Sequence, residues 1–215
     1  HFRALHLENG VRLIEGMGVN RLLGAGRVEA AELSDGQRIA CDVVVAGIGA
    51  MPETALAATA GLAVEGGIAT DDRGRTSHEA VWAAGDCAAT LAGGRRLRLE
   101  SVGNAIDQAE NVALNMLGRD VPYRPRPWFW TEQFDARMQI AGLSEGHDKM
   151  VPRPGNRPGG RSFWYFRGPS LIAVDAVNDP QAYLAGRRLI EAGRTVDPDT
   201  IADPASDLKR LAPAA

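Results

Sequence analysis

The sequence predicts a mixed fold, α/β in its first part and α+β in its last part. Up to residue 117, short strand-like runs alternate with helix signals. Residues 119–127 contain three prolines and are expected to form a linker to a separate domain. From residue 128 onward, alternating strand patterns precede one strong helix signal. This order is typical of an antiparallel sheet backed by helices.

The composition is that of an ordinary globular protein and argues against several function classes. The chain has 215 residues, 45% of them hydrophobic and 24% charged, which suits one large or two small domains. Its net charge of −3 argues against a general nucleic-acid binder. No apolar run approaches the ~20 residues of a membrane span, and the first residues do not resemble a signal peptide.

The cysteines and histidines give no metal or disulfide pattern. Cys41 and Cys87 form no Cys-x-x-Cys pair, and the four histidines lack metal-ligand spacing. We therefore expect no metal site and two reduced cysteines in a cytoplasmic protein.

Residues 10–49 are expected to form a β meander. The expected strands are Val11–Glu15, Val19–Leu23, Val28–Leu33 and Arg38–Ala46, with a hairpin turn signal at Asp35 and Gly36. The last strand contains three valines at 43–45 that are expected to be buried. Gly47 and Gly49, on either side of Ile48, then permit a flat ring to approach the backbone. A simple strand-end turn is the alternative.

The middle of the chain has the pattern around which the rest is organised. A small-residue strand at 81–84 ends in Gly85 and Asp86, and after a short polar loop a helix begins near Asn104. The helix is indicated by apolar residues at helical spacing, which are Ala105, Ile106, Ala109, Val112, Ala113 and Met116. Before this pattern come a short helix, a brief strand and a turn, expected at Glu53–Gly61, Gly67–Thr70 and Asp71–Ser77.

The last part of the chain is expected to contain five strands and a long helix. The strands are Trp128–Gln133, Arg137–Ala141, His147–Val151, Arg161–Arg167 and Leu171–Val177. The helix begins behind a capping Asp179 with Pro180 in its first turn, and it ends near Ala192. One or two helical turns are expected within Asp197–Leu211.

The Gly85–Asp86 pattern points to ligand binding. Small side chains let a bulky ligand lie close to the backbone, and the Asp86 carboxylate can accept hydrogen bonds from ligand hydroxyls. The helix start near Ser101 offers unpaired N–H groups to an electron-rich group. A structural aspartate that caps the following turn is the alternative for Asp86.

These residues resemble a known family. Trp82–Cys87 followed by Arg98–Ala109 resembles the second flavin-contact segment of FAD-dependent ferredoxin and rubredoxin reductases. Pro127–Gln133 and Ile172–Asn178 are similar to the C-terminal domain of that family in particular. The resemblance covers the chain from about Gly10 to Leu211.

The resemblance implies a fold, two cofactors and a partner. It implies the end of a flavoprotein core with two dinucleotide-binding domains, followed by an antiparallel-sheet reductase domain. FAD and NADH are the implied cofactors, and a ferredoxin or rubredoxin that feeds an oxygenase or P450 is the implied electron acceptor. A homodimer is left open. The implied domains are the end of the NADH domain at 1–50, part of the FAD domain at 51–120 and the reductase domain at 126–211.

The glycine-rich turns that hold the cofactor phosphates in this family are absent from the sequence. We therefore expect this chain to be the C-terminal half of a reductase and to be inactive by itself. The alternatives are another NADH oxidoreductase of the superfamily, similar to apoptosis-inducing factor, and a non-catalytic module for docking or dimerisation.

The resemblance also implies a set of flavin-site residues. They are Gly85, Asp86, Glu100, Ser101, Val102 and Gly103, with Gly47, Ile48 and Gly49 on the nicotinamide side and Trp130 near the flavin edge. Glu100 is equally well explained as a charge at a helix terminus. The resemblance implies variation at Gly103, where relatives often have a larger residue, because the effect of the helix terminus needs no particular side chain. Trp128 and Trp130 are expected on opposite faces of their strand, one of them in the core.

A basic stretch provides a candidate docking surface. No acidic residue occurs between Lys149 and Val174, and the prolines and glycines there predict a loop that carries Arg153, Arg157 and Arg161. Such a run is usually a solvated surface. The alternative is electrostatic docking of an acidic ferredoxin.

Overall fold

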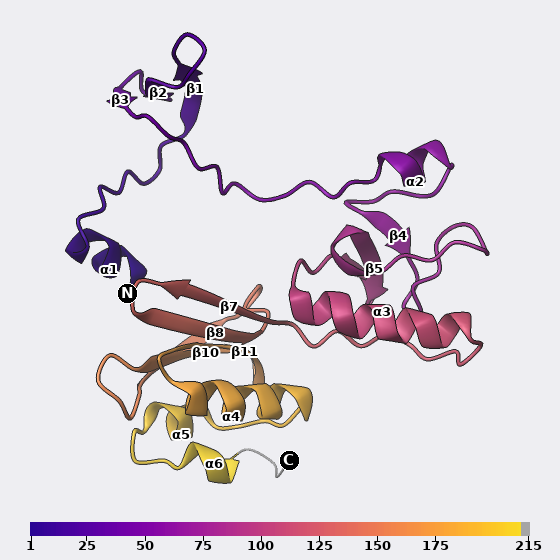
Figure 1. The fold of residues 1–215 in the computed structure, drawn as a ribbon. Coiled ribbons are helices and arrows are strands. Elements are labelled where there is room, and N and C mark those ends of the chain that lie inside the picture. Colours follow the sequence, from indigo (N-terminus) through magenta and orange to yellow (C-terminus); the bar gives the residue numbers. More distant parts are fainter. Residues whose placement is uncertain (212–215) are drawn as a thin grey trace. The chain divides into compact units, whose positions relative to one another are not determined.

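The computed structural model describes residues 1–211, and the chain divides into two compact units (Figure 1). The first unit comprises residues 1–51, and the second begins at Pro52. Among the described residues, no helix combines the length and the apolar character that a membrane crossing requires.

The first unit contains one short helix and a three-stranded antiparallel sheet. Its elements are α1 (Phe2–Glu8), β1 (Val19–Leu23), β2 (Ala30–Leu33) and β3 (Arg38–Ala40), with the strand order β1-β2-β3. The Glu32 carboxylate accepts hydrogen bonds from Arg21 on β1 at 2.9 Å and from Arg38 on β3 at 3.2 Å. One side chain of the central strand therefore links all three strands.

Part of the β meander expected in this unit is not formed. Residues 11–15 form no strand, and the strand expected over Arg38–Ala46 ends at Ala40. The valines at 43–45 are exposed rather than buried, and Val45 is 91% exposed. A strand needs backbone partners beside it, and the pairing in this unit ends with β3. Helix α1 is an element that the sequence pattern did not predict.

The second unit begins with a small mixed sheet and a long helix. Its elements are α2 (Ala55–Thr59), β4 (Ile68–Thr70), the 3-10 turn η1 (Gly85–Cys87), β5 (Ala88–Ala92), β6 (Arg95–Leu97) and α3 (Val102–Met116). Strand β4 runs parallel to β5, and β6 runs antiparallel to it. The short helix, the brief strand and the long helix agree with the sequence-based expectation.

Two local expectations in this region are wrong. Residues 81–84 form no strand, because their only pairing among the described residues is an isolated bridge between Trp82 and Arg75. The segment expected as a polar loop forms the hairpin β5–β6 instead. Ala88 and Thr90 on β5 are buried, so packing in the folded unit supports this strand although alanine has a weak preference for strands.

The remainder of the second unit is a five-stranded antiparallel sheet followed by three helices. The strands are β7 (Trp128–Gln133), β8 (Ala136–Gly142), β9 (Lys149–Pro154), β10 (Arg161–Arg167) and β11 (Ser170–Val177), in the order β7-β8-β11-β10-β9. The helices are α4 (Pro180–Glu191), α5 (Pro198–Ala202) and α6 (Leu208–Leu211). The expected cap is present, since Asp179 accepts a hydrogen bond from the Ala182 N–H at 3.1 Å.

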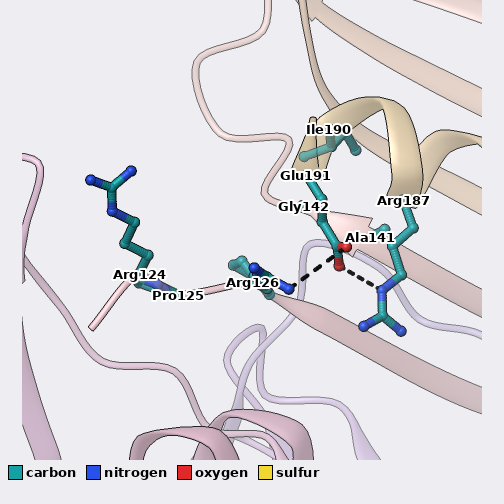
Figure 2. Close-up of a pocket in the computed structure, with 9 residues that line it drawn as sticks. Arg124, Pro125, Arg126, Ala141, Gly142, Arg187, Ile190 and Glu191 are labelled. Carbon is teal, nitrogen blue, oxygen red and sulfur yellow. Dashed lines mark hydrogen bonds and ion pairs between the residues drawn. The ribbon is translucent and has the colours of Figure 1, made fainter. Parts of the chain in front are cut away.

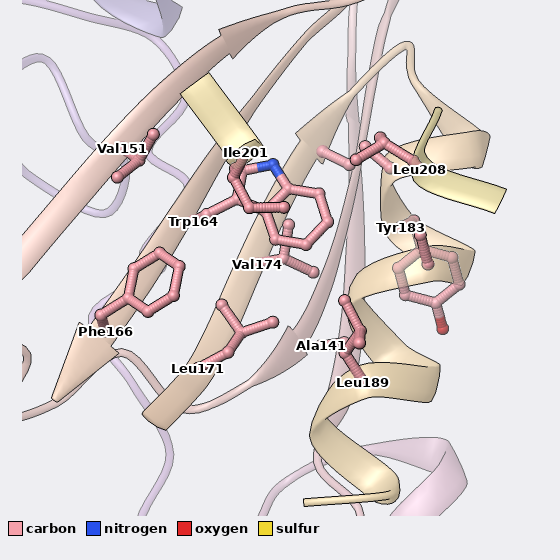
Figure 3. Packing of buried hydrophobic residues seen from close by; sticks show 13 residues of the cluster. Ala141, Val151, Trp164, Phe166, Leu171, Val174, Tyr183, Leu189, Ile201 and Leu208 are labelled. Atoms are coloured by element: carbon pink, nitrogen blue, oxygen red, sulfur yellow. The ribbon is translucent and has the colours of Figure 1, made fainter. Parts of the chain in front are cut away.

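One hydrophobic core lies between this sheet and the helices (Figure 3). Trp164 and Phe166 on β10 and Val174 on β11 are fully buried, and Leu189 of α4 belongs to the same cluster. The Trp164 indole N–H donates to the buried Ser162 Oγ at 2.9 Å, which satisfies the one polar atom of the ring. Burial of this face holds the strands in register, because a slip of one residue would expose it.

The basic stretch expected to be a loop is in part an edge strand. Strand β9 extends to Pro154, and Arg153 on it is only 4% exposed. The Arg153 guanidinium donates to four backbone carbonyls, which are Ile201 O (2.8 Å), Asp203 O (2.5 Å), Pro204 O (3.2 Å) and Ser206 O (2.7 Å). Arg153 therefore anchors the segment between α5 and α6 and is unavailable to a partner. Arg157 and Arg161 are exposed.

Replacing Arg153 with methionine is expected to lower the free energy of unfolding by about 2–4 kcal/mol, because buried carbonyls lose a charged donor. The same replacement at the exposed Arg157 is a matched control and is expected to change it by less than about 0.5 kcal/mol. Urea unfolding of both variants measures the two values. Equal losses would contradict the anchoring role of Arg153.

Candidate functional site

The turn at Gly85 and Asp86 is held by a side chain from α3. Gly85 has a φ of +77°, which favours glycine, and its N–H donates to Gln108 Oε1 at 2.8 Å. Asp86 follows directly and is exposed. No hydrogen bond or ion pair within residues 1–211 occupies its carboxylate. The carboxylate is therefore available to a ligand.

The N-terminus of α3 is capped and well defined. Ser101 Oγ accepts a hydrogen bond from the Asn104 N–H at 3.2 Å. The N–H groups of Val102 and Gly103 belong to the first turn, where a helix has no intrahelical acceptor, and they lie at the positive end of the helix dipole. Glu100 pairs with Arg98, so its carboxylate already has a charged partner.

Gln108 connects the turn to the small sheet through a buried polar network. Besides accepting from the Gly85 N–H, it donates through Nε2 to Thr90 Oγ1 at 2.5 Å. Thr70 Oγ1 donates to the same Thr90 oxygen at 3.1 Å. All three side chains of the network are nearly inaccessible. The backbone at Gly85 is thus fixed to β4, β5 and α3 together.

Tyr123 ties the segment expected as a linker to the same network. Its hydroxyl donates to Asn104 Oδ1 at 2.9 Å, and its backbone N–H donates to Asp72 O at 2.5 Å. Burial, with a smaller contribution from the Asp107 charge, raises the pKa of Tyr123 to about 12. The hydroxyl therefore stays protonated and remains a donor at neutral pH. Residues 119–127 lack regular structure as expected, but they are anchored rather than free.

The same segment borders a cleft of about 270 Å³ beside α4 (Figure 2). Glu191 lies between two guanidinium groups, with Arg187 Nε at 2.8 Å and Arg126 Nη1 at 4.0 Å. The Arg126 pair links the connecting segment to α4, whereas Arg187 and Glu191 both belong to α4. The cleft is lined by none of the predicted flavin-site residues.

The tryptophans of β7 lie on one face of the strand. The rings of Trp128 and Trp130 stack with centroids 5.4 Å apart and an interplanar angle of 23°. The expectation of opposite faces is wrong, because side chains two residues apart on a strand share a face. Trp130 is 46% exposed, and Trp128 is half-buried against Gly103 of α3.

The predicted site residues divide between the two units. Gly47, Ile48 and Gly49 belong to the first unit, in a segment without regular structure where Ile48 is exposed. The remaining predicted residues belong to the second unit. There the structure joins the Gly85 turn to α3 through Gln108, and it joins the first turn of α3 to β7 through Trp128.

Sequence reasoning missed the polar residues that hold the site. Asn104, Gln108 and Asn115 form most of the buried face of α3, whereas Ile106, from the apolar pattern that identified the helix, is 54% exposed. A signal was present, because these polar residues recur near helical spacing along one side of α3.

Replacing Gln108 with alanine is expected to lower the free energy of unfolding by about 2–4 kcal/mol, because the Gly85 N–H and Thr90 lose buried partners. Glu110→Ala, on the exposed side of the same helix, is the matched control and is expected to be near neutral. Denaturant unfolding checks both. A Gln108 variant as stable as the control would show that the network does not hold the turn.

The comparison with family models defines the class of protein. Residues 1–109 match the model described as pyridine nucleotide-disulphide oxidoreductase, and residues 128–212 match the model described as reductase C-terminal. The chain belongs to the pyridine nucleotide-disulphide oxidoreductase family.

Two curated relatives are named as reductases of rhodocoxin and of putidaredoxin. The chain is 39% identical to rhodocoxin reductase of Rhodococcus erythropolis over 97% of its own length and 50% of the relative. It is 34% identical to putidaredoxin reductase CamA of Pseudomonas putida over 100% of its length and 52% of the relative. The chain thus spans about half the length of these curated relatives.

Similar solved structures are likewise reductases of this kind. A ferredoxin reductase from Rhodopseudomonas palustris matches with a TM-score of 0.94 and 36% identity, over 99% of this chain and 53% of that chain. A covalent complex of putidaredoxin reductase with putidaredoxin matches with a TM-score of 0.90 and 34% identity, over 98% of this chain and 52% of that chain.

Proposed function

We propose that the protein containing this chain transfers electrons from NADH through FAD to a ferredoxin or rubredoxin that serves an oxygenase or P450. The observation that carries this proposal is the exposed Asp86 carboxylate on a turn fixed to α3. This turn belongs to a chain of the pyridine nucleotide-disulphide oxidoreductase family, and its relatives include rhodocoxin reductase and putidaredoxin reductase CamA.

The residues of the second unit fit a flavin. The Asp86 carboxylate has no competing partner among the described residues, so it can accept hydrogen bonds from ribityl hydroxyls. Gly85 exposes no side chain that would keep the ligand away. The first-turn N–H groups of Val102 and Gly103, with Ser101 as cap, suit the electron-rich pyrimidine edge. FAD, when bound, supplies the redox chemistry.

Other predicted residues complete the proposed site. We assign Trp130 to the flavin edge, where its half-exposed ring is accessible. Gly47, Ile48 and Gly49 are assigned to the nicotinamide side. Glu100 is assigned to the margin of the site, because Arg98 already engages its carboxylate.

The proposed division into domains follows the same argument. Residues 1–50 are assigned to the end of an NADH-binding domain, 51–120 to the C-terminal segment of an FAD-binding domain and 126–211 to a C-terminal reductase domain. The boundary near residue 50 is supported by the first compact unit, which ends at Met51. The boundary near 126 is supported by the family model that begins at residue 128.

The direct test is NADH-dependent reduction of a ferredoxin by the full-length protein. Reduction of a ferredoxin at a rate well above that of free flavin is the expected result. Transfer of electrons from NADH to small acceptors but to no iron–sulfur protein would favour the alternative, an NADH oxidoreductase with another acceptor.

Replacing Asp86 with alanine in the full-length protein is expected to weaken FAD binding by about 10- to 150-fold. This range corresponds to the loss of about 1.5–3 kcal/mol for a charge-assisted hydrogen bond. Flavin retained after dilution measures the affinity. Glu79→Ala removes another exposed carboxylate and serves as control. Equal retention in both variants would leave Asp86 without a role in binding.

The exposed residues of the basic stretch, Arg157 and Arg161, allow a test of electrostatic docking. Reversing Arg157 and Arg161 to glutamate is expected to slow reduction of an acidic ferredoxin at low salt, because exposed charges act mainly on encounter. The defect should shrink with added salt, since the Debye length falls from about 30 Å at 0.01 M to about 10 Å at 0.1 M. Stopped-flow rates at several salt concentrations measure this effect.

Two controls accompany the charge reversal. Ferricyanide reduction should be unchanged, because a small acceptor needs no docking surface. Reversal of the exposed Arg119 and Arg124 makes the same change in net charge elsewhere and should have little effect. If reversal of Arg119 and Arg124 slows ferredoxin reduction and reversal of Arg157 and Arg161 does not, docking occurs at residues 119–127.

A further inference from the structure

The first turn of α3 contacts the indole of Trp128 without any intervening side chain. A Cβ atom placed on Gly103 would lie 2.2 Å from Trp128 Nε1, 2.6 Å from Cε2 and 3.0 Å from Cζ2. These separations are far shorter than carbon contact distances of about 3.5–4.0 Å. In this structure any side chain at position 103 would therefore displace the ring.

The ring of Trp128 also stacks on the ring of Trp130. Its stack with Trp130 has a centroid separation of 5.4 Å, and Trp130 reaches the surface. An indole is rigid and turns only about two bonds, so it cannot bend away from an obstacle as a methionine does. The position of the α3 first turn, the plane of Trp128 and the plane of Trp130 are consequently coupled.

We propose that Trp128 is a positioning residue, whose indole seated on Gly103 sets both the α3 N-terminus and the ring of Trp130. This proposal rests on the proposed function, because those two groups are the ones assigned to the flavin. Trp128 acts through them and needs no contact with the cofactor. A side chain at position 103 would have to displace the ring, because the ring occupies the space of a Cβ atom.

A double-mutant cycle in the full-length protein tests the contact itself. Gly103→Ala should abolish the exciton couplet of the stacked indoles in circular dichroism and lower Tm by roughly 2–10 °C. In a Trp128→Leu background the space is free, so Gly103→Ala should leave Tm unchanged or raise it, since alanine favours a helix. An equal fall of Tm in both backgrounds would overturn the proposed contact.

The flavin potential distinguishes positioning from mere packing. Displacement of the α3 N-terminus in Gly103→Ala should lower the potential of bound flavin, because the reduced form loses a stabilising dipole. Adding Gly103→Ala to Trp128→Leu should produce no further shift. A potential unchanged by Gly103→Ala, together with a lost couplet, would overturn the positioning role.

The two measurements also keep this inference separate from the proposed function. The couplet and Tm report on the Gly103–Trp128 contact whether or not flavin binds. Full-length protein that binds no FAD would refute the proposed function, and with it the positioning role. The couplet and Tm would still decide whether the contact exists.

Discussion

The hydrogen bond from the Gly85 N–H to Gln108 is the constraint on which the candidate site depends. It joins a turn without regular pairing to a helix that starts nearby. Because Gln108 also donates to Thr90, the same side chain connects the turn, the helix and the small sheet. A site placed on such elements keeps its geometry better than one placed on loops, since its supporting side chains are locked by packing.

Two further segments of the second unit are attached to helix α3. Tyr123, in the connecting segment, donates a hydrogen bond to Asn104 of α3. Trp128, on β7, packs against Gly103 of the same helix. The C-terminal sheet has its own anchor, in which Arg153 binds the chain between α5 and α6. A positive charge in that position is stabilised by carbonyl dipoles rather than by a carboxylate, and this holds the last helices on the core.

These anchors change the functional interpretation of particular residues. The sequence pattern makes Arg153 a candidate for partner docking. In the structure Arg153 lies on strand β9 and its side chain is buried. Glu100 moves to the margin of the proposed site, because Arg98 already engages its carboxylate. Gly103 gains importance for the opposite reason, because the ring beside it leaves no room for a side chain.

The sequence by itself determined the order of the strands and helices from Trp128 onward, with β7 and β10 placed to the residue, and it indicated the family. Local chemistry sufficed there, because strand alternation, the Asp179 cap and the Gly85–Asp86 motif are readable over a few neighbouring residues. Prediction from the sequence failed where the burial or hydrogen bonding of a residue depends on segments that are distant in the chain. The valines at 43–45 need strands beside them, and the buried face of α3 is polar because Thr90 and Tyr123 supply hydrogen bonds from other segments. Only the tertiary structure decided these cases, since burial and hydrogen-bond partners are properties of the folded neighbourhood and not of the sequence window.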